Sequence, residues 1–143
     1  MPTILPVQGH TPHIPDSCFL APTATVVGDV QMGEECSVWF NAVVRGDVHF
    51  IRLGHRVNVQ DNAVIHCTYQ KFPTTIGDNV SIGHNAIVHG CTLHDNVLVG
   101  MGSGDYALPI GHIQNMEINV TGVFRYTDTW PAAIHLVTSG AVD

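Results

Sequence analysis

The chain has 143 residues, of which 12% are charged, and its formal net charge is −7, with five Lys and Arg against twelve Asp and Glu. A nucleic-acid interface or a polybasic membrane anchor needs a basic patch, so this composition excludes both kinds of partner. Because no apolar run approaches about 18 residues, no membrane-spanning helix is predicted.

The N-terminal segment, MPTILPVQGHTPHIP, has neither the basic start nor the apolar centre of a signal peptide. The four cysteines, Cys18, Cys36, Cys67 and Cys91, form no CxxC pair. We therefore expect reduced thiols in a cytoplasmic protein. The 14 glycines and 8 prolines suit short strands and tight turns better than long helices.

From residue 32 onwards the sequence has a six-residue repeat, which residues 14–30 carry less regularly. Aliphatic residues recur in three triplets, Met32, Val38 and Val44; Leu53, Val59 and Ile65; Ile76, Ile82 and Val88, and Leu93 and Val99 begin another pair. Small or β-branched residues mostly stand four positions later: Cys36, Ala42, Val48, Val57, Ala63, Val80, Ala86, Thr92 and Val97. This period fits neither an α-helix nor an alternating strand. It predicts an all-β solenoid, a left-handed parallel β-helix of triangular coils, with a β-sandwich as the alternative.

Two interruptions and a tail divide the chain. Residues 45–52 add three residues between triplets, and residues 66–75 add five, which we expect to protrude from a corner. The repeat stops after Gly104, so we expect a β-helix domain over 1–104 and a separate tail over 105–143. In the tail, 116–124 is typical of a strand and 129–139 of a helix, with Asp128 or Thr127 as N-cap and Gly140 as its end.

The repeat assigns three of the ten histidines to particular columns. His66 and His89 each follow the third aliphatic residue of a coil, so they should lie about 5 Å apart in one outward column, close enough to share a metal ion. His84 lies two past Ile82, on the second face, and can join them only if a neighbouring subunit of a homotrimer presents it. Three histidines leave one position open for water, as in catalytic zinc sites.

The same columns hold charged residues. Arg45 shares the column of His66 and His89, with Asp47 near it on the same strand, and Asp61 shares the column of His84. When the two faces of neighbouring subunits meet, Arg45 should face Asp61 and fix the subunit register. Gln60, beside Asp61, could hydrogen-bond the metal-bound water.

The segments VVGDVQMGEECSVWFNAVVRGDVHFIRLGHRVNVQDNAVIHC and IGDNVSIGHNAIVHGCTLHDNVLVGMGS closely resemble the gamma-class carbonic anhydrase-like family over about residues 4–104. The resemblance implies a trimeric left-handed β-helix in which His66 and His89 of one chain and His84 of the next bind the metal. It also implies interface and pocket roles for Arg45, Asp47, Gln60 and Asp61, and a place near the pocket for Asn58. Active members carry glutamate proton relays, whereas this chain has Val48 at one such position and Lys71, without an acid, in loop 68–75.

The tail departs from that family. The segment PIGHIQNMEINVTGVFRYTDTWPAAIHLVTSGAVD resembles a fragment of a zinc-dependent polyol dehydrogenase of the sorbitol type. In that family Arg125 and Tyr126 would lie near the substrate pocket, but its nucleotide-binding glycines and zinc ligands are absent here.

The leading hypothesis is reversible hydration of carbon dioxide, a small-molecule substrate, by a metal that lowers the pKa of its bound water. Turnover should be weak without the relay acids. The metal is expected to be zinc, with iron and cobalt as alternatives. A non-catalytic, metal-stabilised trimeric module and a hexapeptide-repeat acyltransferase are the other hypotheses.

Overall fold

The computed structural model describes residues 1–100, which form twelve short strands and no helix. These are β1 (Thr3–Leu5), β2 (Phe19–Leu20), β3 (Thr25–Met32), β4 (Ser37–Val38), β5 (Val43–Leu53), β6 (Asn58–Val59), β7 (Val64–His66), β8 (Thr74–Ile76), β9 (Ser81–Ile82), β10 (Ile87–His89), β11 (Thr92–Leu93) and β12 (Leu98–Val99). Within that part of the chain, no helix could cross a membrane.

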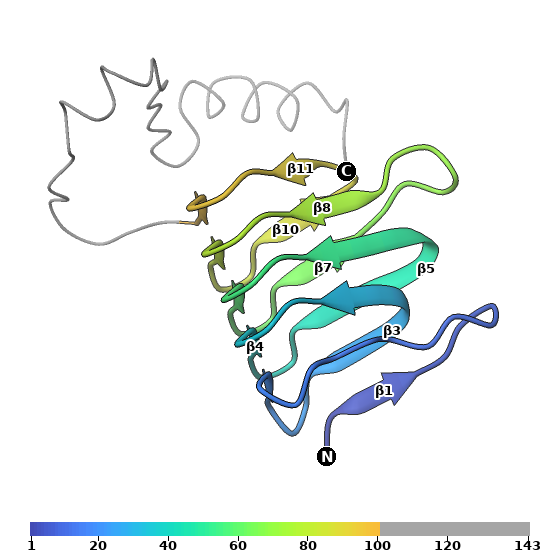
Figure 1. Cartoon of the computed structure of the whole chain (residues 1–143), viewed down its shortest axis with the longest axis horizontal. Helices are drawn as coiled ribbons and strands as arrows, with labels where there is room; N and C mark the ends of the chain where they lie inside the picture. Colours follow the sequence, from blue (N-terminus) through green and yellow to red (C-terminus); the bar gives the residue numbers. More distant parts are fainter. Residues whose placement is uncertain (101–143) are drawn as a thin grey trace, which may run out of the picture. The chain divides into compact units, whose positions relative to one another are not determined.

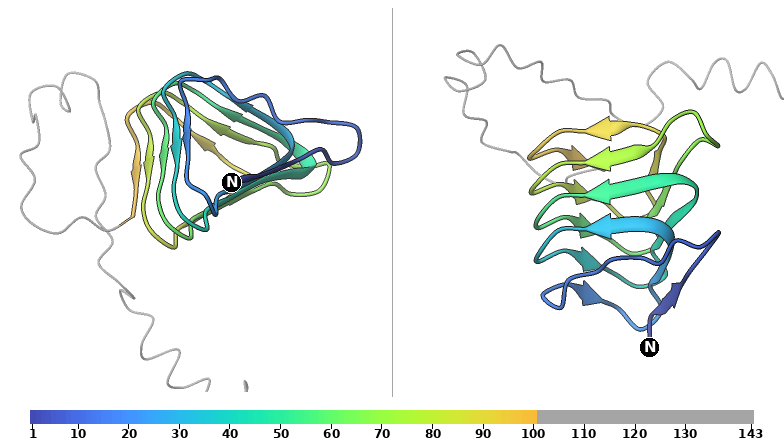
Figure 2. Two further views of the ribbon diagram at one scale, coloured as in Figure 1. Left: turned by 90° about the horizontal axis from the view of Figure 1, so that it is seen from below. Right: turned by 45° about the vertical axis from the view of Figure 1, so that its right-hand side comes forward.

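Every pairing between these strands is parallel, and each strand pairs with the equivalent strand of the next coil. One sheet runs β1-β3-β5-β7-β10, with β8 pairing both β5 and β11, and a second runs β2-β4-β6-β9-β12. Figure 1 shows the coils stacked on one another, and the axial view in Figure 2 shows their triangular outline. The fold is the left-handed parallel β-helix that the six-residue period predicts.

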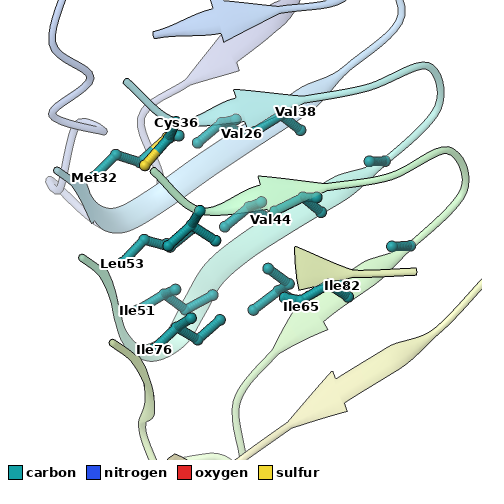
Figure 3. Close-up of a cluster of buried hydrophobic side chains, with 14 of the residues drawn as sticks. Val26, Met32, Cys36, Val38, Val44, Ile51, Leu53, Ile65, Ile76 and Ile82 are labelled. Atoms are coloured by element: carbon teal, nitrogen blue, oxygen red, sulfur yellow. The ribbon is translucent and has the colours of Figure 1, made fainter. Parts of the chain in front are cut away.

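The core consists of columns of aliphatic side chains inside the coils (Figure 3). The strand register stacks Met32 on Leu53 and Ile76, Val38 on Val59 and Ile82, and Val44 on Ile65. All nine residues of the predicted triplets are at most 5% exposed. Leu93 and Val99, in the last described coil, are half-buried. Since each coil covers the apolar side of the next, the stacking supplies the hydrophobic stabilisation.

The small and β-branched residues that stand four positions after the aliphatic ones are buried in only part of the chain. Cys36, Ala42, Val57, Ala63 and Val80 are buried, whereas Val48 is half-buried and Thr92 is exposed. Val48 lies among the extra residues of the corner, and Ile51 occupies the buried position instead. The step from Val88 to Leu93 is one residue shorter than the period, which moves Thr92 out of the frame.

The corners between the strands depend on a left-handed backbone. Seven residues have φ between 55° and 62°, each three positions before an aliphatic core residue: Glu35, Asn41, Arg56, Asn62, Asn79, Asn85 and Asn96. Five of them are asparagine, a residue that tolerates this region better than most. Glycine follows the core residue where coils approach closely, and a Cβ on Gly33 would lie 2.5 Å from the Gly54 carbonyl oxygen.

The two interruptions have different structures. The first does not break a strand, because β5 runs continuously from Val43 to Leu53 around the corner and pairs with β3, β7 and β8. The second leaves the coil after Cys67, forms a turn closed by the Thr68–Phe72 bridge, and returns at Thr74. Tyr69 at its tip is 64% exposed, so this loop protrudes as the sequence predicts.

All four cysteines are free thiols, as expected. The predicted tail over 105–143, with its strand at 116–124 and helix at 129–139, lies outside the described residues. The division at residue 104 and the resemblance of the tail to polyol dehydrogenases therefore stay predictions.

Candidate metal centre

The two-histidine face, formed by the first part of β5 together with β7 and β10, carries His66 and His89. These residues are register partners on β7 and β10. Their ring centroids are 5.1 Å apart with the planes inclined by 61°. Both side chains point outward because each follows an inward aliphatic residue, Ile65 or Val88. The structure thus places the two imidazoles together, where the repeat predicts them.

Asp47 holds the His66 ring from the coil below. The Nε2 atom of His66 lies 2.9 Å from Oδ1 of Asp47, and the other carboxylate oxygen forms an ion pair with Arg45. The side chains of His66 and Asp47 are only 17% and 22% exposed. Burial alone would raise the pKa of the Asp47 carboxyl, but the hydrogen bond with His66 and the charge and hydrogen bond of Arg45 together lower it below its usual value. The contacts with Asp47 therefore fix the orientation of the His66 ring within the chain.

The one-histidine face, formed by β4, β6 and β9 with the corners that follow them, carries His84. Its Nδ1 atom lies 3.0 Å from Oδ2 of Asp61, and the two side chains are 62% and 36% exposed. A hollow on this face is lined by Ser37, Trp39, Asn58, Gln60, Asp61 and His84. The predicted residues Asn58, Gln60, Asp61 and His84 therefore lie together.

The side chain of Asn58 has three hydrogen-bond partners that the sequence did not reveal. Its side-chain oxygen accepts hydrogen bonds from the Ser37 hydroxyl and the Trp39 indole N–H, both at 2.9 Å, and its amide donates to Ser81 at 3.4 Å. Ser37, Asn58 and Ser81 are register partners in adjacent coils. This ladder holds one wall of the hollow.

Two contributors to these faces were missed. Trp39 directly follows Val38, so the frame that located His66 would also have placed Trp39 outward beside Asn58. Thr74 stands two positions before Ile76, at an inward site where a polar residue is exceptional. Both could have been found by applying the repeat frame to every residue type rather than to histidines and charges.

Within residues 1–100 of a single chain, no group of three or more His, Cys, Asp or Glu side chains is placed to hold a metal ion. Two imidazoles stand together on one face and the third stands on another. Inside the chain Arg45 pairs with Asp47, and Asp61 with His84. The cross-subunit contact of Arg45 with Asp61 stays a prediction.

Residues 73–104 match the protein family described as "Bacterial transferase hexapeptide (six repeats)". The chain is 56% identical over 82 residues to a probable carbonic anhydrase from Methanocaldococcus jannaschii, an alignment that covers 57% of this chain and 51% of the relative. It is 43% identical over 106 residues to the mitochondrial gamma carbonic anhydrase 2 of Arabidopsis thaliana, covering 71% and 38%. The chain is similar to gamma carbonic anhydrases. It spans roughly two fifths to one half of the length of these relatives.

A solved structure supports the fold assignment. A hexapeptide transferase family protein from Anaplasma phagocytophilum superimposes with a TM-score of 0.65 at 42% identity, covering 70% of this chain and 58% of that protein. The similarity to gamma carbonic anhydrases and the hexapeptide fold therefore agree. Neither relative named above is a polyol dehydrogenase, so the expected resemblance of the tail gains no support from them.

Proposed function

We propose that this chain is a gamma carbonic anhydrase-like enzyme that reversibly hydrates carbon dioxide with a divalent metal. His66 and His89 of one subunit and His84 of a neighbouring subunit would hold that metal. The observation that carries the proposal is the division of the imidazoles, two adjacent on one face and one exposed on the next. The similarity to gamma carbonic anhydrases supports the reaction.

The residues present fit such an ion. Two adjacent imidazoles are typical ligands of zinc, iron and cobalt, and zinc is the metal we propose. When bound, a divalent ion lowers the pKa of a water ligand and so supplies a nucleophile near neutral pH.

The remaining site residues have distinct proposed tasks. Asp47 orients the His66 ring through the 2.9 Å contact, and Arg45 keeps Asp47 ionised. On the one-histidine face, Asp61 holds His84, and the Gln60 amide lines the hollow, where it can hydrogen-bond a water or substrate oxygen. The side-chain oxygen of Asn58 is occupied by hydrogen bonds from Ser37 and Trp39, so we assign Asn58 the task of shaping the hollow.

The surface of the two-histidine face supports a homotrimer. Val43, Val64 and Ile87 are register partners in an outward column beside the histidines. Ile87 is 72% exposed in the single chain. An apolar outward column beside incomplete metal ligands is suited to burial against a second copy, and a threefold arrangement would bring the one-histidine face of each copy against it. The Arg45–Asp61 contact is part of this proposal.

We further propose that turnover is slow. The residue after Asp47 is Val48, and the protruding loop presents Tyr69, Gln70 and Lys71 without an acid. Neither position can pass a proton to solvent as a carboxylate does. Four free thiols agree with the cytoplasmic location that we propose.

Stopped-flow measurement of carbon dioxide hydration by the full chain tests the proposal. The zinc- or cobalt-loaded protein should hydrate carbon dioxide faster than the chelated protein, with the larger difference at alkaline pH. Gln60→Ala should lower the rate, whereas His55→Ala, an exposed histidine outside both faces, should not. Equal rates for loaded and chelated protein at all pH values would contradict the proposed activity.

Two other functions have observations in their favour. Val48 and the acid-free loop favour a non-catalytic trimeric module, in which chelation dissociates the trimer and no activity is lost. The match of residues 73–104 to a transferase hexapeptide family favours an acyltransferase, which would use a histidine base without a metal. If the purified protein contains almost no metal and still binds none when zinc is added, that result would favour the acyltransferase.

A further inference from the structure

The single buried polar side chain among the described core residues is Thr74, at 0% exposure. It begins β8, where the protruding loop rejoins the coil. Its column neighbour Ile51 and the next residue along, Val30, are buried and apolar. Packing therefore requires only a β-branched side chain at this position, and a hydroxyl needs another reason because burying a polar group is costly without partners.

The hydroxyl finds its partners at the ends of the two histidine strands. It donates to the main-chain carbonyl of His66 at 2.6 Å and accepts the N–H of Gly90, directly after His89, at 3.0 Å. The Gly90 N–H is shared with the His66 carbonyl at 3.1 Å. One side chain thus contacts the peptide groups that follow both histidines.

This contact lies where the ladder between the two strands ends. After His66 the chain leaves through Cys67 into the loop, and after His89 it turns at Gly90 with φ of 56°. A Cβ on Gly90 would lie 2.9 Å from the Thr68 hydroxyl and 3.2 Å from Cβ of Phe72, so this turn is packed tightly on the base of the loop. Without Thr74, the last peptide groups of β7 and β10 would have fewer partners to hold them in register.

We infer that Thr74 is a positioning residue for the metal centre, holding the backbone of His66 and His89 so that their imidazoles share one ion. The inference rests on the proposed function. Asp47 orients one ring from outside the coil, and Thr74 fixes both strand ends from inside it. The five-residue insertion therefore ends in a buried hydroxyl that bonds the backbone of the two-histidine pair.

The test is a competitive titration of zinc or cobalt into the full chain, with the visible absorption of bound cobalt as the second readout. Thr74→Val keeps the shape and removes the hydroxyl, and it should weaken metal affinity roughly 10- to 100-fold, the usual effect of losing a residue that supports a metal ligand. It should also change the cobalt spectrum. Thr74→Ser should retain affinity within about threefold because it keeps the hydroxyl. Thr75→Val, on the neighbouring half-buried residue, is the matched control and should change nothing.

The outcomes separate this inference from the proposed function. If the wild-type chain binds metal and Thr74→Val matches it in affinity and spectrum, Thr74 has no positioning role and the proposed metal centre still stands. If the wild-type chain binds no metal, the metal centre itself is wrong and this inference is overturned with it. Should Thr74→Val fail to fold, Thr74→Ser and Thr74→Ala differ only by the hydroxyl, and equal affinities in that pair would overturn the inference.

Discussion

The two-histidine face and the one-histidine face belong to the same coils but hold their histidines differently. His66 is 17% exposed, contacts Asp47 on the strand below and has its backbone bonded to Thr74. His84 is 62% exposed, and its side chain pairs with Asp61, which is itself 36% exposed. The difference indicates that His66 is oriented within the chain, whereas in the proposed trimer His84 would gain a fixed position from the neighbouring subunit that covers it.

The largest effect is expected inside the two-histidine face. Ile65, beneath His66, is fully buried, and Ile65→Ala should lower the free energy of unfolding by about 2–5 kcal/mol through lost contacts and a cavity. Ile87, outward on the same face, is 72% exposed. Ile87→Ser should change the unfolding free energy of the dissociated chain by less than about 0.5 kcal/mol and instead weaken assembly. Urea unfolding and sedimentation velocity measure the two effects, and equal destabilisation by both variants would contradict this inside–outside difference.

The second effect distinguishes the faces at alkaline pH. Cys36 lies just before β4 of the one-histidine face, and burial raises the pKa of its thiol from 9.0 to about 11. The protonated Cys36 thiol contributes its full stabilisation to the folded chain below pH 9. This contribution is lost as the pH rises towards 11, because the thiol of the unfolded chain ionises first. The loss should reach roughly 2–3 kcal/mol. Burial also raises the pKa of Cys67. In Cys36→Ala the unfolding free energy should therefore still fall between pH 9 and 11, but less steeply than in the wild-type chain. An unchanged slope of unfolding free energy between pH 9 and 11 in Cys36→Ala would show that Cys36 is not the cause.

The third effect is smaller and appears at acid pH. Because the pKa of Asp47 is lowered from 3.8, its stabilisation is present above pH 3.8 and is lost as pH falls through the lower folded value. Asp47→Asn should cost about 1–2 kcal/mol at pH 7, since it weakens the contacts with both His66 and Arg45. Asp61→Asn, on the more exposed pair, should cost less than about 0.5 kcal/mol. If the two variants are equally destabilising in the metal-free chain, the two faces are not organised differently.

Much of this arrangement could be predicted because the fold is periodic. Within each triplet the six-residue step gives the buried positions, such as Ile82 between Ile76 and Val88. Matching the third members of two triplets, Ile65 and Val88, then gives the pairing of His66 with His89. Val48 and Thr92 are not buried like Cys36 and Ala42 because the count changes there, at a corner with extra residues and at a coil one residue short. The asparagines at the corners carry a second signal, left-handed backbone, that could have corrected the frame.

Contacts between side chains were harder to predict. The frame places Arg45 and Asp61 in facing columns, but it cannot say that Arg45 pairs with Asp47 inside the chain, because that depends on side-chain rotamers. The frame could have marked Thr74 as a polar residue at an inward position, but it could not have given its partners, because these are main-chain groups without a sequence signature. The periodicity therefore predicts which residues share a column, whereas the structure is needed to show which side chains form hydrogen bonds and ion pairs.

The most direct test mixes subunits of two variants, His66→Ala and His84→Ala, by refolding them together at equal amounts and measuring bound zinc. Each variant alone should bind almost none. If His66 and His89 of one subunit share a metal with His84 of the next, random mixing leaves each site with a half chance of an intact two-histidine face and a half chance of an intact neighbouring His84, so the mixture should recover about one quarter of the wild-type metal. A mixture that binds no more zinc than the separate variants would contradict a metal centre shared between subunits.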